Sequence, residues 1–258
     1  MDIPVFANVR IELAEHVATV EFTAGSANFL SLEVMQQLAA AWDWADAEAD
    51  CRSVVLCSTG SVFCAGVNLT SLAGAGPERS PEQIYLLGLH LLKGRKPVIA
   101  AIQGAAVGAG LGLAMLADQR VAGPRARFNA SFVRLGFNAG FGLTATLPYA
   151  IGARLASRML LTGQPIDAQE AVCLGLADEA VDDEEVRAAA QARARVIAGN
   201  APRVVQDMRQ ALREPLIEEF RKAIEREWAL QRSHMSTNDF MEGISAMLAK
   251  RDPKFVGN

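Results

Sequence analysis

Hydrophobic and polar residues alternate in the first part of the chain. The alternation has period two in residues 9–13 and again in residues 17–22, and Ala14-Glu15-His16 separates the two runs. Successive side chains of a strand point to opposite faces of its sheet, so this pattern predicts a β-hairpin with one buried face.

Continuous apolar runs follow the hairpin. Ser53–Ser58 and Val98–Ile102 are two such runs, and another strand is expected near Gln119–Ala122. Such runs are typical of strands that are buried on both faces of a parallel sheet. Segments with helical spacing lie between them: residues 32–42 after a capping Ser31, residues 84–92 and residues 110–117. Strands and helices in alternation predict an α/β fold with right-handed crossovers.

From about residue 150 the apolar positions follow helical spacing alone. The segments are 154–161, 168–174, 184–197, 204–212, 216–235 and 237–249. Gly163, Gly175, Pro202 and Pro215 are expected to end or break these helices. The sequence therefore predicts an α/β part followed by a helical part.

Two glycine-containing stretches carry the candidate chemistry. Residues 63–69 (Phe-Cys-Ala-Gly-Val-Asn-Leu) follow a predicted strand, and residues 104–112 lead into a predicted helix. Small residues let the main chain approach a ligand, and free N–H groups at the start of a helix favour negative charge. The pair predicts an oxyanion hole built from backbone N–H groups. The alternative is two tight turns without a ligand.

Four blocks of the chain, in order, resemble the crotonase family, the enoyl-CoA hydratases and isomerases. They are Phe63–Leu69, Pro97–Gly104, the helix from Gly108-Ala109-Gly110 to Ala117-Asp118, and Leu161-Thr162-Gly163 with Ala168–Ala171 and Leu174–Leu176. The resemblance runs from about Val9 to Phe255. One block alone is a weak signal, but four in this order over the whole length are a specific one.

The resemblance implies a fold and an assembly. It implies a crotonase-like spiral of ββα units in residues 1–200 and a C-terminal helical region in residues 201–258 that covers the site. In the family this helical region builds trimers, so a homotrimer or a dimer of trimers is expected. The segment Lys250–Phe255 resembles the family tail that reaches toward a neighbouring subunit.

The resemblance also assigns a ligand and its contacts. The oxygen of an acyl-CoA thioester is expected between the backbone N–H groups of Val67 and Ala109. Coenzyme A is expected against Cys64, Ala65 and Gly66, with basic residues at its phosphates. Lys254 is one such candidate, along with Lys93, Arg95, Lys96, Lys250 and Arg251, although each also fits a solvated charged face. Coenzyme A enters as part of the substrate, so no separate cofactor and no metal are expected.

The acid–base positions of the family hold residues that cannot transfer a proton. Gly112 and Phe132 match the two glutamates of the hydratases, and Gly140 matches an Asp or Glu used by some isomerases, dienoyl isomerases and dehalogenases. No Asp or Glu occurs between Gln119 and Thr162, so a shifted alignment does not supply one. Because general acid–base groups contribute ~10²–10⁴-fold each, the chain resembles a crotonase that lacks the usual carboxylates.

Few polar side chains remain as substitutes. Tyr85 and Asn138 complete the predicted pocket, and Glu78 and Ser131 lie near it in the sequence. A tyrosine can donate a proton, although packing in the core is its commoner role. Asn and Ser position water but are not bases near neutral pH. His90 lies five residues beyond Tyr85 and is predicted to face away from it.

Composition narrows the partners. The formal net charge is −4, and no basic stretch interleaved with aromatic residues predicts nucleic-acid binding. No apolar run reaches the ~18 residues of a membrane span, and the N-terminus lacks a basic and then apolar signal, so a cytoplasmic protein is expected. The four cysteines show no metal-binding spacing and are expected to be reduced thiols.

Three functions remain open at this point. The first is an enoyl-CoA hydratase or isomerase type of enzyme that stabilises a thioester enolate with an unorthodox proton carrier. The second is a CoA-thioester decarboxylase, which makes its enolate by losing CO₂ and needs no base. The third is an acyl-CoA-binding protein that kept the fold and lost the chemistry.

Overall fold

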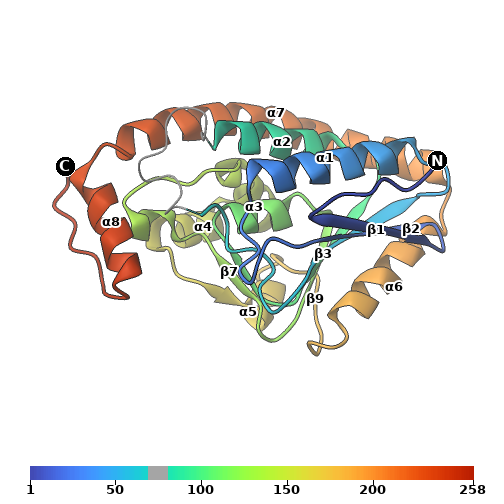
Figure 1. Ribbon diagram of the computed structural model, residues 1–258, viewed down its shortest axis with the longest axis horizontal. Helices are drawn as coiled ribbons and strands as arrows, with labels where there is room; N and C mark the ends of the chain where they lie inside the picture. Colours follow the sequence, from blue (N-terminus) through green and yellow to red (C-terminus); the bar gives the residue numbers. More distant parts are fainter. Residues whose placement is uncertain (69–80) are drawn as a thin grey trace.

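The computed structural model describes residues 1–68 and 81–258, and it is built around two sheets (Figure 1). The larger sheet has the strand order β1-β2-β3-β4-β6-β9, and β1 and β2 form its only antiparallel pair within the described residues. Its strands are β1 (Val9–Ala14), β2 (Val17–Phe22), β3 (Ser53–Ser58), β4 (Val98–Ile102), β6 (Gln119–Ala122) and β9 (Glu179–Ala180). The predicted hairpin and the predicted buried strands are confirmed.

Helices cover both faces of this sheet. The helices of the described residues are α1 (Leu32–Ala47), α2 (Glu82–Lys93), α3 (Ala109–Met115), α4 (Leu143–Thr162), α5 (Ala168–Cys173), α6 (Val186–Ala198), α7 (Pro202–His234) and α8 (Asn238–Leu248). Val55 and Ile99 pack with α6 on one face, whereas Leu56 and Ala100 belong to the main core on the other. Side chains of one strand thus enter two separate cores, which explains the unbroken apolar runs.

A second, small sheet was not predicted. It consists of β5 (Ala105–Val107), β7 (Arg127–Asn129) and β8 (Ile166–Asp167). A 3₁₀ helix, η3 (Ser131–Leu135), follows β7. These strands have two or three residues each, which is too short for a periodic pattern to reveal them.

The predicted break at Pro215 is wrong, because α7 runs without interruption through residues 202–234. Proline removes one backbone N–H from a helix interior. Here Pro215 is exposed, so the carbonyl that loses its partner lies on the solvent side of the helix. Buried Leu216 and Phe220 anchor the helix beyond that position.

The start of α4 also differs from the prediction. This helix begins at Leu143 rather than near Arg154 and continues through a kink at Gly152. Its first turn is stabilised from α7, because the Glu227 carboxylate accepts hydrogen bonds from the backbone N–H groups of Gly142 and Thr144 at 2.7 and 2.9 Å. A cap that comes from 85 residues away leaves no local sequence signal.

Helix α7 crosses the molecule along the top of Figure 1 and packs against α2 and α4. The expected division between residues 200 and 201 lies just before this helix and stays a prediction. The predicted α/β part followed by helices at the C-terminus is confirmed.

Candidate functional site

The fold brings the two glycine stretches into direct contact. Cys64 pairs in parallel with Ala106 of β5: its N–H donates to the Ala105 carbonyl and its carbonyl accepts from the Val107 N–H, both at 2.9 Å. The Gly108 N–H in turn donates to the Asn129 carbonyl at 2.9 Å. The backbone that precedes Val67 and the backbone that precedes Ala109 are therefore tied together by main-chain hydrogen bonds.

Gly66 makes this close approach possible. Its φ is +84°, and a Cβ atom placed on it would lie 2.7 Å from the Val107 carbonyl oxygen and 3.3 Å from the Ala109 nitrogen. A larger residue would both strain the backbone and push the second stretch away. The glycine in the first stretch thus sets the spacing between the two predicted N–H donors.

Val67 and Ala109 both line a small chamber, which we call the inner chamber. It has a volume of about 60 Å³ and is lined by Ala65, Gly66, Val67, Pro81, Tyr85, Val107, Gly108, Ala109, Ser131, Phe132, Leu135, Phe137, Gln231 and Met235. Within the described parts of the chain, neither the Val67 N–H nor the Ala109 N–H donates to a protein acceptor. Two unused donors on one chamber can bind a single oxygen atom that carries negative charge.

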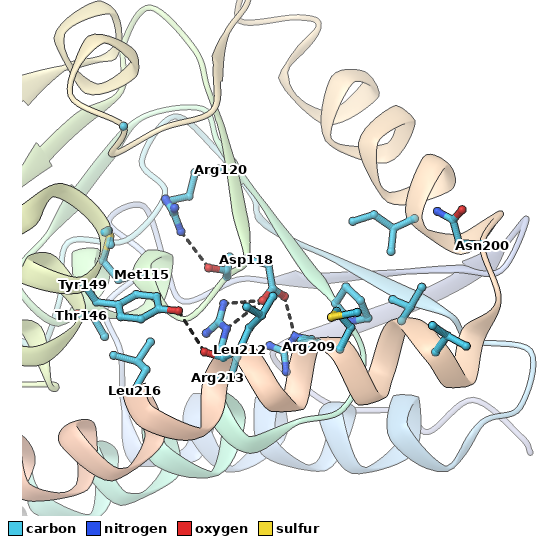
Figure 2. Close-up of a pocket in the computed structure, with 18 of the residues that line it drawn as sticks. Met115, Asp118, Arg120, Thr146, Tyr149, Asn200, Arg209, Leu212, Arg213 and Leu216 are labelled. Atoms are coloured by element: carbon cyan, nitrogen blue, oxygen red, sulfur yellow. Dashed lines mark hydrogen bonds and ion pairs between the residues drawn. The ribbon is translucent and has the colours of Figure 1, made fainter.

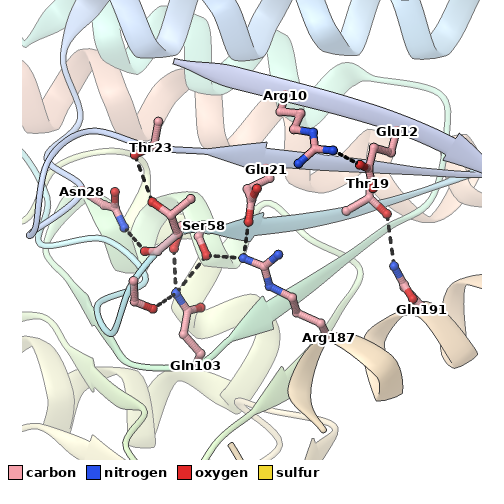
Figure 3. Close-up of polar contacts among 12 residues, drawn as sticks. Arg10, Glu12, Thr19, Glu21, Thr23, Asn28, Ser58, Gln103, Arg187 and Gln191 are labelled. Atoms are coloured by element: carbon pink, nitrogen blue, oxygen red, sulfur yellow. Dashed lines mark hydrogen bonds and ion pairs between the residues drawn. The ribbon is translucent and has the colours of Figure 1, made fainter. Parts of the chain in front are cut away.

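A polar network supports the segment that enters the first glycine stretch (Figure 3). Buried Asn28 donates from its Nδ2 to the carbonyls of Thr59 and Val62 at 2.7 and 2.8 Å. Gln103 donates from its Nε2 to the Ser58 hydroxyl at 2.9 Å. Arg187, which is paired with Glu21, donates to the Ser58 carbonyl at 2.8 Å. These bonds fix the loop without using any atom of the inner chamber.

The predicted acid–base position at Gly112 is closed by an aromatic ring. A Cβ atom at Gly112 would lie 2.5 Å from Cδ1 of Phe141, and a Cβ atom at Gly88 of α2 would lie 2.9 Å from the same ring. Phe141 is fully buried and adopts a left-handed backbone conformation with φ of 59°. The ring therefore occupies the space into which a side chain at residue 112 would project.

The predicted position at Gly140 is closed by a hydrogen-bonded pair. A Cβ atom at Gly140 would lie 2.2 Å from the Tyr85 hydroxyl oxygen and 2.6 Å from Nε2 of Gln231. Tyr85 also packs edge to face on Phe141, with ring centroids 5.9 Å apart. The space next to Gly140 is thus filled by two polar side chains from α2 and α7.

Phe132, the third predicted position, lies on the inner chamber itself. Its ring packs edge to face on Phe137 at 5.5 Å, and both rings line the chamber. Together with Tyr85 and the more deeply buried Phe141, they form what we call the aromatic wall.

Asn138 and Glu78 are further residues that the sequence predicts at or near the site. Asn138 does not line the inner chamber, but its backbone carbonyl accepts a hydrogen bond from Gln231. Glu78 lies outside the described residues. Among the described residues that line the inner chamber, none is Asp, Glu or His; the polar side chains there are Tyr85, Ser131 and Gln231.

Gln231 is the residue that sequence reasoning missed. It is fully buried and receives a hydrogen bond from the Tyr85 hydroxyl at 2.8 Å. The sequence carries a partial signal, since Glu227 and Gln231 are spaced by four on a long helix and share one face. Nothing local distinguishes this polar face from the solvent-exposed faces of α7.

Glu227 itself is a buried carboxylate near the aromatic wall. Its oxygens accept from the N–H groups of Gly142 and Thr144 and from the Thr144 hydroxyl. Burial raises the pKa of Glu227 to about 7, against the opposing effect of these hydrogen bonds. The contacts make it a cap for α4, and it does not line the inner chamber.

A larger groove, which we call the outer groove, continues from the inner chamber. It has a volume of about 750 Å³ and shares Ala65, Val67 and Ser131 with the chamber. Arg134 and Arg251 also line it, and they form ion pairs with Asp252 and Glu242. A ligand in the chamber has an open path along this groove.

The structure places some of the predicted coenzyme A contacts on the chamber or the groove and others elsewhere. Ala65 lines both the chamber and the groove, and Gly66 lines the chamber. The main-chain N–H and carbonyl of Cys64 are used in pairing with β5. Lys254 lies in a separate hollow with Glu242 and Arg251 rather than on the groove. These assignments stay predictions.

A third cavity lies away from this site, beside the first half of α7 (Figure 2). It has a volume of about 850 Å³, and Asp118, Arg209 and Arg213 line it. Asp118 pairs with both arginines, at 2.8 and 2.7 Å. Burial opposes ionisation, but the two guanidinium groups hold the pKa of Asp118 below its usual range. All three charged groups are engaged with one another, so this cluster joins α7 to the segment after α3.

No helix within residues 1–68 and 81–258 is both long and apolar enough to span a membrane.

Comparison with known proteins identifies the family. Residues 12–258 match the family model of enoyl-CoA hydratase/isomerase. The chain is 33% identical to (E)-benzylidenesuccinyl-CoA hydratase of Thauera aromatica, over 96% of this chain and 99% of that protein. It is also 33% identical to 2,3-dehydroadipyl-CoA hydratase of Escherichia coli, over 89% and 91% of the two chains.

Solved structures agree with this assignment. An enoyl-CoA hydratase/isomerase from Pseudoalteromonas atlantica T6c superposes with a TM-score of 0.87 at 25% identity, over 96% of this chain and all of that one. Pseudomonas aeruginosa OdaA superposes with a TM-score of 0.84 at 28% identity, over 94% and 99%. The chain belongs to the enoyl-CoA hydratase/isomerase family.

Proposed function

We propose that the protein is an acyl-CoA-thioester enzyme that stabilises a thioester enolate between the N–H groups of Val67 and Ala109. The observation that carries this proposal is the pair of residues on one small chamber whose amide N–H groups have no acceptor among residues 1–68 and 81–258. An enolate oxygen takes up more negative charge than a ground-state carbonyl, so fixed donors stabilise it more strongly. The acyl group enters the inner chamber and coenzyme A extends along the outer groove. Arg134 and Arg251 line that groove, and their ion pairs with Asp252 and Glu242 would be shared with or exchanged for its phosphates.

A substrate panel tests this function. Purified protein is mixed with crotonyl-CoA, and hydration is followed by loss of the enoyl absorbance. Turnover that exceeds the uncatalysed rate and requires Ala109 supports an enzyme of the hydratase/isomerase type. Turnover within tenfold of a hydratase that carries two catalytic glutamates would show that the aromatic wall does not limit proton transfer.

Decarboxylation is a second candidate, favoured by the absence of Asp, Glu and His from the described chamber lining. Loss of CO₂ from a malonyl-type thioester leaves the electron pair of the broken C–C bond on the enolate, so no base is required. Apolar rings such as Phe132 and Phe137 favour neutral CO₂ over a carboxylate. Release of CO₂ from malonyl-CoA, without hydration of crotonyl-CoA, would support decarboxylation as the function. Tight binding of both thioesters without turnover would instead indicate an acyl-CoA-binding protein.

We also propose a homotrimer or a dimer of trimers. Val204, Met208 and Leu212 are spaced by four on α7, and their exposed fractions are 61%, 59% and 63%. Met208 and Leu212 border the cavity of Figure 2, so together they offer an apolar surface beside a hollow. Light scattering after size exclusion gives the mass in solution. A trimer or hexamer that dissociates in the Met208→Glu variant is expected, and a monomeric wild-type protein contradicts the proposal.

A further inference from the structure

The polar end of the inner chamber consists of one directed chain of hydrogen bonds. The Tyr85 hydroxyl donates to Oε1 of Gln231 at 2.8 Å, and Nε2 of Gln231 donates to the Asn138 carbonyl at 3.0 Å. Tyr85 is 4% exposed and Gln231 is not exposed at all. Both line the chamber that Val67 and Ala109 also line.

The direction of this chain is fixed by its last acceptor. A backbone carbonyl such as that of Asn138 only accepts, so the amide group of Gln231 faces it with its nitrogen. The Oε1 atom of Gln231 then faces Tyr85 and must receive the phenolic proton. A hydroxyl group has one proton, so the remaining polar capacity of the Tyr85 oxygen is its lone pairs.

One face of helix α7 holds this chain of hydrogen bonds in place. Asn138 donates from its Nδ2 to the Glu227 carbonyl at 3.2 Å, and its Oδ1 lies 3.0 Å from Nδ1 of His234. Glu227, Gln231 and His234 are spaced by four and three, so they share one side of the helix. The side chain of Asn138 and the backbone carbonyl that orients Gln231 are therefore both held by α7.

The phenol group of Tyr85 stays protonated near neutral pH. Burial raises the pKa of Tyr85 above its ordinary range. A neutral phenol oxygen is a weak hydrogen-bond acceptor and not a base. Tyr85 can therefore orient a partner group but does not remove a proton from it.

We propose that Tyr85 is a specificity-determining residue that accepts a hydrogen bond from a hydroxyl group on the acyl chain, and that Gln231 is the positioning residue that makes Tyr85 an acceptor. The inference rests on the proposed acyl-CoA ligand. Val67, Ala109 and Tyr85 all line one chamber of about 60 Å³, so the hydroxyl lies close to the thioester. We test a hydroxyl on the third carbon of the acyl group, and the inference predicts that thioesters with such a hydroxyl bind more tightly than those without one.

Unreactive thioethers test this assignment without the oxyanion hole. S-butyl-CoA, S-(3-hydroxybutyl)-CoA and S-(3-fluorobutyl)-CoA lack the carbonyl oxygen, so they bind without forming an enolate. Isothermal titration calorimetry gives their dissociation constants with the wild-type protein. We expect the hydroxy compound to bind roughly three- to tenfold more tightly than the fluoro compound, which has a group of similar size but no proton to donate.

Variants then assign the preference to this hydrogen-bond chain. In Tyr85→Phe the ratio of the hydroxy and fluoro dissociation constants should fall to about one. In Gln231→Met the ratio should fall by at least half, because the phenolic proton is free to turn toward the chamber. Ser131→Ala removes the other hydroxyl that lines the chamber, and it should leave the ratio unchanged. Circular dichroism checks that each variant is folded, and the wild-type comparison needs no variant.

The outcomes separate the two proposals. If neither the three thioethers nor crotonyl-CoA binds, the acyl-CoA ligand itself is wrong and the inference fails with it. If crotonyl-CoA binds but none of the thioethers does, this inference alone is overturned, because Tyr85 then adds no measurable affinity. If all three bind equally to the wild-type protein, or if Ser131→Ala rather than Tyr85→Phe removes the preference, this inference alone is overturned.

Discussion

The two sides of the inner chamber are held by different parts of the chain. On one side, Val67 and Ala109 present main-chain groups, and backbone pairing of Cys64 with β5 fixes their spacing. On the other side, Tyr85 and Gln231 present side chains from α2 and α7, packed against glycines that leave room for them. The first side depends on the path of the backbone, whereas the second depends on which side chains fill a limited space. Members of a family can therefore share the main-chain side of the chamber and differ in the side chains on the other side.

Removal of one main-chain donor should have the largest effect on activity. Ala109→Pro deletes an N–H group at the first position of α3, where proline fits a helix. Loss of one oxyanion donor typically costs ~10²–10³-fold in turnover, and steady-state kinetics on the active substrate measures it. The control is Ala109→Gly, which keeps the N–H and should retain most of the activity. Equal activity of the two variants would contradict the role of this amide.

The side-chain part of the site should respond to volume rather than to backbone chemistry. Gly112→Ala forces a Cβ atom against Phe141, and overpacking of this kind typically costs ~1–3 kcal/mol. Urea unfolding should therefore give a lower free energy of unfolding. In the double variant with Phe141→Ala, the total loss should be smaller than the sum of the single losses by about 1 kcal/mol or more. Additive losses would mean that the ring and residue 112 do not compete for space.

The junction between α7 and α4 should make stability depend on pH. The pKa of Glu227 is about 7 in the folded protein, above the ordinary value of 4.5. The folded state therefore holds this proton more tightly, so the stabilisation is full below about pH 4.5 and is lost as the pH rises through 7. We expect a loss on the order of 3 kcal/mol across this window, since one pKa unit corresponds to about 1.4 kcal/mol. Urea unfolding at several pH values should give a shallower dependence for Glu227→Gln, and an identical dependence would refute the assignment.

The smallest effects are expected at the basic residues near the outer groove. Arg251→Ala removes an exposed guanidinium that lines the groove, so KM should rise about two- to fivefold while kcat stays constant. Lys254→Ala serves as the matched comparison, because its side chain lies in the neighbouring hollow. A larger effect at Lys254 than at Arg251 would indicate that coenzyme A follows a different path.

The sequence predicted the main-chain side of the site better than the side-chain side. The glycine stretches are contiguous, so their residues indicate a close backbone approach before the fold is known. The residues around Tyr85 are contributed by α2, α7 and the loop at 138–142, and their contacts depend on tertiary packing. The sequence shows that residues 112 and 140 are glycines, but only the structure identifies Phe141 and the Tyr85–Gln231 pair as the groups that occupy the adjoining space.

Some elements of the fold could likewise be predicted from the sequence and others could not. The large sheet and most helices follow from periodicity, because their side chains repeat with a fixed spacing. The first half of α4 and the continuity of α7 across Pro215 do not, because long-range contacts decide them. The strands of the small sheet are too short to repeat any pattern, although β5 positions the Val107–Ala109 backbone.

The contact between Gly112 and Phe141 also limits the order in which this site could change during evolution. A carboxylate at residue 112 is tolerated only after residue 141 has become small, and a small residue at 141 first leaves a cavity beside Tyr85 and Gly88. Each single substitution is then less stable than the state before both or after both. A protein could pass through such an intermediate only if its free energy of unfolding were high enough to absorb the loss. Relatives that carry only the carboxylate at residue 112, or only the small residue at 141, should therefore be rare.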